Sequence, residues 1–182
     1  MSGVSNDFRG VVLGTLIMAA VSTLADAFWA AALPEHKAIY GLAHGGVVLG
    51  VLGLTLAWLV GGKRILRWGV ISLLVGVFAA VIFYGLYSFV GSLAILLAWM
   101  ILWLAYAQIA DAAAPMPEGT RRAIFRGVLA AVLSGIGFWA ISGIWLGPHD
   151  PGMFYWRNFG SWCIAFVPGY LALLAGRSSK PA

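Results

Sequence analysis

The stretch RRAIFRGVLAAVLSGIGFWAISGIWLG, from Arg121 to Gly147, decides the fold class of this chain. It opens with three arginines within six positions and continues with apolar and small residues. Small residues recur in it at multiples of four positions, at Gly127, Ala131, Gly135, Gly143 and Gly147. In an α-helix this spacing places them on one face, where a second helix or a flat ligand can approach the backbone closely inside a bilayer. The stretch therefore predicts a transmembrane helix with one smooth face and one basic end.

The composition extends this interpretation to the whole chain. Of its 182 residues, 62% are hydrophobic and 9% are charged, and the mean hydropathy is +0.96. This is too little charge for the water-facing surface of a soluble domain of this size. The single cysteine, Cys163, excludes an intramolecular disulfide and a cysteine-based zinc site. The polar start, Met1 to Gly10, lacks the pattern of a cleaved signal peptide, so we expect the first apolar run to be retained.

Apolar runs of about 20 residues, the length that crosses a hydrocarbon core of about 30 Å, occur six times. They predict an all-α integral membrane bundle of six transmembrane helices in a single polytopic domain, with spans near 11–33, 38–61, 66–86, 91–110, 123–146 and 155–176. The uncharged segment 68–110 would be about 65 Å long as one helix, which is too long for a bilayer. We therefore expect it to fold back once, near Tyr87 to Gly91.

The distribution of basic residues predicts the orientation. With six spans, the amino tail, the second and fourth connections and the carboxyl tail share one side of the membrane. Nine of the eleven Lys and Arg residues fall on that side: Arg9, Lys63, Arg64, Arg67, Arg121, Arg122, Arg126, Arg177 and Lys180. The other side keeps Lys37 and Arg157. Because basic residues mark the cytoplasmic side, we expect both termini in the cytoplasm, and we attribute the net charge of +5 to topology and not to nucleic-acid binding.

Asp26 is the most conspicuous polar residue, because it lies within the first apolar run. An ionised carboxylate there costs at least about 2.5 kcal/mol, so it needs a partner or water. Two roles are open: a structural role with bonds to Tyr40, His44 or a neighbouring helix end, or contact with a ligand or an ion.

The sequence carries no recognisable metal or catalytic signature. His36 and His44 share a helix face but lie about 12 Å apart along the axis, too far to bind one metal ion. A haem between His44 and His149 is a minor alternative that requires His149 to reach inward from its turn. No nucleophile elbow or base at a known spacing occurs. We therefore expect no enzymatic activity, no metal and no cofactor other than a bound lipid.

The candidate ligand-binding residues come from the fourth and fifth predicted spans. They combine flat rings with small hydroxyl groups, which suit an apolar chain and a small polar head. They are Trp99, Trp103, Ser134, Phe138 and Ser142. The recurring small residues of these spans have a plainer interpretation, which is the close packing of helices. Small-residue faces also predict self-association into a dimer or trimer.

Several of these features together resemble the Insig family, the small sterol-responsive membrane proteins of the endoplasmic reticulum. They are the six spans, the acid that closes the first run, the Pro34 to Lys37 turn, the glycine-rich fifth span, and the entry to the last span at Phe154 to Phe159. The resemblance implies a non-catalytic fold that encloses a lipid-accessible cavity. It also implies that Asp111 faces a partner protein, although the arginines that follow this acid in the family are missing here. The composition, rich in Ala, Gly and Arg, suggests a bacterial relative in the cytoplasmic (inner) membrane.

The leading hypothesis is thus an Insig-like protein that binds or senses a membrane lipid resembling a diacylglycerol, a hopanoid or a sterol. The alternative is a small transporter or proton-coupled carrier that uses Asp26, with Tyr40 and His44 as a relay. An intramembrane acid is the feature that such a carrier requires.

Overall fold

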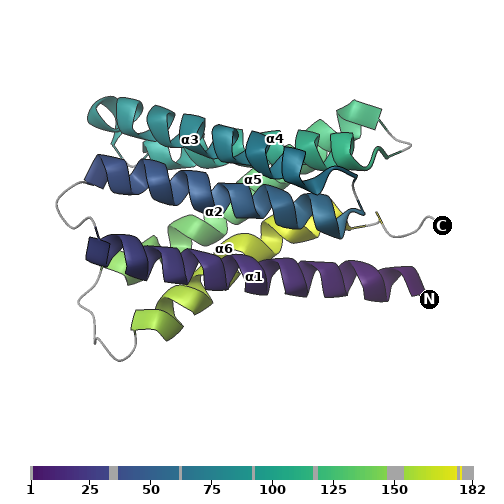
Figure 1. Cartoon of the computed structure of the whole chain (residues 1–182), viewed down its shortest axis with the longest axis horizontal. Coiled ribbons are helices and arrows are strands. Elements are labelled where there is room, and N and C mark those ends of the chain that lie inside the picture. The colour runs from purple at the N-terminus through teal and green to yellow at the C-terminus, as the bar shows by residue number, and fades with distance from the viewer. Residues whose placement is uncertain are drawn as a thin grey trace.

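The structure is a computed structural model, and it describes residues 2–32, 37–61, 63–91, 93–116, 119–146, 154–175 and 177. This part of the chain is all-helical, which confirms the all-α part of the prediction. The six helices are α1 (Ser2–Ala32), α2 (Lys37–Leu59), α3 (Ile65–Val90), α4 (Leu93–Ala113), α5 (Gly119–Leu146) and α6 (Phe154–Leu174). They run back and forth, so that the start of α1 and the end of α6 lie at the same end of the bundle (Figure 1).

Three segments of the described chain are long and apolar enough to cross a membrane. They are Asp7–Phe28 in α1, Ile65–Val90 in α3 and Leu96–Ala113 in α4. A shorter apolar segment, Gly45–Leu59, lies in α2. These lengths and compositions indicate a membrane protein.

The fold-back between α3 and α4 lies at Gly91, within the predicted range. Gly91 has a φ of 57°, a left-handed conformation that a glycine adopts without steric cost, and its N–H donates to the carbonyl of Tyr87. The helix α3 thus continues four residues beyond the predicted span end at residue 86. The reason is that hydropathy alone does not mark a helix end, whereas the glycine does.

Small residues bring α2 and α3 close together. A Cβ atom built on Gly76 of α3 would lie 2.7 Å from the Cβ of Leu49 and 2.8 Å from the carbonyl oxygen of Gly45, both on α2. A Cβ on Gly50 of α2 would lie 3.3 Å from the Cβ of Leu73. The small-residue faces of these two helices are therefore occupied by each other within the chain.

The core between α4 and α6 is aromatic. Its largest fully buried side chains are Trp103, Tyr106, Phe166 and Tyr170. A side chain at Gly169 would overlap the Trp103 ring, so this glycine makes room for the indole. The hydroxyl of Tyr106 donates to the carbonyl of Leu49 at 2.9 Å, and this bond ties α4 to α2.

Arginines close the end of the bundle where α4 and α6 finish. The last carbonyls of a helix have no partner within it, so other donors must satisfy them. Arg177 donates to Leu173 at 2.9 Å, and also to Ala110 at 3.2 Å and Ala114 at 2.9 Å. Arg126 of α5 donates to the same Leu173 carbonyl at 3.3 Å. Two arginines thereby connect the ends of α4 and α6 to the start of α5.

Candidate functional site

The structure brings three of the predicted ligand-binding residues together where α4, α5 and α6 meet. The indole N–H of Trp99 donates to the hydroxyl of Ser134 at 3.0 Å, and Ser134 in turn donates to the carbonyl of Ala165. Phe138 stacks on Trp99 with ring centroids 4.8 Å apart. The indole N–H and the hydroxyl are therefore bonded inside the protein, and the rings pack on each other. We call these three residues the Trp99–Ser134–Phe138 cluster.

Trp103 and Asp111 are predicted residues that lie outside this cluster. Trp103 is fully buried, with its ring centroid 6.3 Å from that of Trp99. Ser142, Tyr40 and His44 lie outside the residues whose side chains the structure describes. Asp111 is in the last turn of α4, where its Oδ1 accepts the N–H of Met116 at 3.2 Å and fixes the chain after the helix.

A proline in α6 explains why α5 approaches it at small residues. Pro168 lies inside α6 and has no N–H, so the carbonyl of Ile164 receives no bond from the residue four positions later. Gly137 of α5 lies against this carbonyl, since a Cβ there would be 2.9 Å from the Ile164 oxygen. Ser134, one turn earlier, bonds the next carbonyl along α6. The small residues of α5 thus cover the part of α6 where the proline interrupts the helix.

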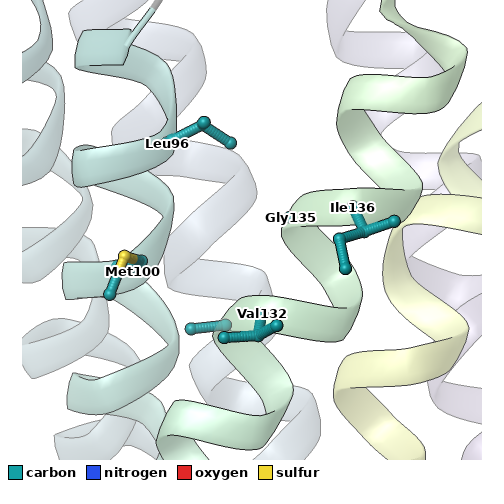
Figure 2. A pocket seen from close by; sticks show the side chains of 6 residues that line it. Leu96, Met100, Val132, Gly135 and Ile136 are labelled. Atoms are coloured by element: carbon teal, nitrogen blue, oxygen red, sulfur yellow. The ribbon is translucent and has the colours of Figure 1, made fainter.

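A groove with a volume of about 310 Å³ lies between α4 and α5, and we call it the α4/α5 groove. Its lining is entirely apolar and consists of Leu96, Met100, Ala131, Val132, Gly135 and Ile136. Figure 2 shows Leu96 of α4 and Val132 of α5 extending into the space between the two helices. A Cβ on Gly135 would lie 3.7 Å from Cδ1 of Trp99, so the floor of the groove rests against that indole. Trp99 therefore lies behind this groove, and none of Trp99, Ser134 and Phe138 belongs to its lining.

A second groove, of about 430 Å³, lies between α5 and α6, and we call it the α5/α6 groove. Its lining combines arginines with apolar residues: Arg122, Phe125, Arg126, Leu129, Leu133, Pro168, Leu171, Ala172 and Ala175. No acidic residue is among them. From the sequence alone, these arginines indicated only the membrane topology. The groove could have been predicted from the sequence, because one helix face carries, at helical spacing, Arg122, Arg126, Leu129 and Leu133.

Asp26 receives hydrogen bonds from α6. Its Oδ2 accepts the indole N–H of Trp162 at 2.8 Å and the side-chain amide of Asn158 at 3.5 Å. Both donors are buried. Neither donor was predicted from the sequence, although an amide and an indole four residues apart share one helix face. These bonds satisfy a carboxylate in an apolar helix, as a structural role requires.

The described residues contain no group of three or more His, Cys, Asp or Glu side chains placed to hold a metal ion. No protein-family profile, curated protein or solved structure matches the chain. The function is therefore argued from the two grooves and from the polar contacts between the helices.

Proposed function

We propose that the protein is a six-span membrane protein that binds the apolar chain of a membrane lipid in the α4/α5 groove, without catalysis. The orientation has both termini in the cytoplasm. Its support is that the start of α1, the α2–α3 and α4–α5 connections and the end of α6 share one end of the bundle (Figure 1). Most of the basic residues belong to these segments. Such an asymmetry is typical of the cytoplasmic side.

The α4/α5 groove is the observation that carries this proposal. Its volume of about 310 Å³ lies at the lower end of the range of about 300 to 1,000 Å³ found for small-molecule sites. Val132 and Ile136 are 45% and 60% exposed, so the groove opens on the outer surface of the bundle. In a bilayer that opening faces lipid, and an entirely apolar lining suits a hydrocarbon chain or a flat isoprenoid.

The position of the groove also supports a sensing role. Its floor touches Trp99, whose bond to Ser134 continues to α6 through the Ala165 carbonyl. A ligand that wedges α4 away from α5 strains this series of bonds, so occupancy of the groove is communicated to α6. The Insig-like relationship inferred from the sequence is part of this proposal, and the motifs quoted above are its support.

Binding is favoured over catalysis by the chemistry next to the groove. The Trp99 indole, which lies behind the groove, bonds the Ser134 hydroxyl, and this hydroxyl bonds a backbone carbonyl. A carrier that uses Asp26 has less support, because the bonds from Trp162 and Asn158 give this carboxylate a structural task.

The test compares two valines one helical turn apart on α5. Val132 lines the groove, whereas Val128 is similarly exposed, at 40%, and lines neither groove. We expect Val132→Trp to fill the groove and to lower the amount of co-purified lipid, measured by native mass spectrometry, by about tenfold, since overpacking costs about 1–3 kcal/mol. Val128→Trp is the control and should retain the lipid of the wild type. Equal retention by both variants contradicts the proposal.

A further inference from the structure

The α5/α6 groove has the polarity of a lipid molecule. Arg122 and Arg126 lie one turn apart near the start of α5, and Leu129 and Leu133 continue the groove along the same helix. The 11 residue steps from Arg122 to Leu133 span about 16 Å of helix. This length is close to half of a hydrocarbon core of about 30 Å, which is the depth of one leaflet. The groove is therefore charged where a headgroup lies and apolar where an acyl chain lies.

The charged end of this groove favours an anion. Arg122 is in the first turn of α5, where the helix dipole adds positive potential. Arg126 is 8% exposed, donates to the Leu173 carbonyl and lines the same groove one turn further along α5. Arginine also bonds phosphate oxygens in a bidentate geometry.

The apolar part of the groove does not by itself distinguish one lipid from another. Lipid chains outside the protein are as apolar as the lining, so moving a chain into the groove brings little hydrophobic gain. Selection must come from the headgroup together with the fit of the chain. Among the residues that line the two grooves, arginines occur in the α5/α6 groove and no charged residue occurs in the α4/α5 groove.

We infer that the α5/α6 groove binds an anionic glycerophospholipid of the cytoplasmic leaflet. The phosphate is held at Arg122, in the positive potential of Arg126, and one acyl chain lies along Leu129, Leu133 and Ala172. The inference rests on the six-span arrangement proposed above and is independent of what occupies the α4/α5 groove.

The decisive comparison uses two adjacent arginines. Arg121 and Arg122 are both exposed at the start of α5, but only Arg122 lines the groove. Native mass spectrometry of the purified full chain, titrated with phosphatidylglycerol or with phosphatidylcholine of the same acyl chains, gives the affinity for each lipid. We expect the wild type to prefer phosphatidylglycerol. Arg122→Gln should weaken phosphatidylglycerol binding about fivefold, the effect of one basic residue near an anionic lipid surface, and Arg121→Gln should leave it unchanged.

Three results would overturn the inference. If the wild type binds the two lipids with equal affinity, the groove does not select an anionic headgroup. Equal losses in Arg121→Gln and Arg122→Gln show diffuse attraction instead of a site. An unchanged affinity in Ala172→Trp, which fills the groove and keeps both arginines, shows that no chain lies there.

Two further readouts keep the alternatives apart. The same spectra report the oligomeric state, so a dimer that Ala172→Trp dissociates would assign the groove to a second copy of the chain. The variant Val132→Trp should keep its phosphatidylglycerol affinity while losing the lipid of the α4/α5 groove. The proposal for the α4/α5 groove and the proposal for the α5/α6 groove can thereby be refuted separately.

Discussion

Replacing Gly76 with alanine should force α2 and α3 apart. The new Cβ would lie 2.7 Å from the Cβ of Leu49 and 2.8 Å from the carbonyl oxygen of Gly45. Neither atom is the flexible end of a side chain, so the helix axes must move. Overpacking costs about 1–3 kcal/mol, and alanine recovers up to about 1 kcal/mol through its higher helix propensity. We expect the free energy of unfolding to fall by about 1–2 kcal/mol, measured by tryptophan fluorescence in mixed micelles of increasing sodium dodecyl sulfate content.

The control for this prediction is Gly85→Ala in the same helix. A Cβ on Gly85 would meet no atom within 4 Å, so the substitution adds helix propensity without a clash. It should raise the free energy of unfolding by about 0.5–1 kcal/mol. If Gly76→Ala is as stable as Gly85→Ala, close packing at the small residues does not set the distance between α2 and α3, and the reasoning is refuted.

Two further predictions concern buried polar contacts between helices. Tyr106→Phe removes the bond to the Leu49 carbonyl, and the free energy of unfolding, measured in the same micelle titration, should fall by about 0.5–1.5 kcal/mol; no change would mean that this bond does not hold α4 to α2. Asp26→Ala leaves the buried Trp162 indole without its acceptor and should cost about 1–3 kcal/mol, whereas Asp26→Asn keeps an acceptor oxygen and should recover most of this loss. A stable Asp26→Asn protein with abolished pH-dependent flux in proteoliposomes would instead support the carrier hypothesis.

The number of helices could be predicted from the sequence because each apolar run has the length of one membrane crossing and a charged or Gly-containing break separates it from the next. Helix ends were less predictable. The helix α1 starts at Ser2, nine residues before its apolar run, because a polar segment continues the helix without contributing hydropathy. In contrast, Gly91 marks the α3 end closely, since its left-handed backbone conformation breaks the helix.

The lining of the two grooves was not predicted from the sequence, and none of Trp99, Ser134 and Phe138 belongs to it. Trp99 and Ser134 were chosen for their chemistry, and the structure joins them by a hydrogen bond across 35 residues. The sequence could not show that Ser134 also bonds α6, because the packing of α5 against α6 is a tertiary contact between distant segments. The donors to Asp26 were missed for the same reason, as the pairing of α1 with α6 is set by tertiary packing.

The bonds of Arg177 set an order of events during synthesis. Arg177 and Ala110, whose carbonyl it caps, are 67 residues apart in the chain. At about 5–20 residues per second, ribosomes complete α4 about 3–13 s before they add Arg177. During that interval the carbonyl of Ala110 can accept the N–H of Ala114, whereas the carbonyl of Ala114 lacks its bond from the Arg177 guanidinium. Arg177 therefore fastens the end of α4 only after α6 has been synthesised.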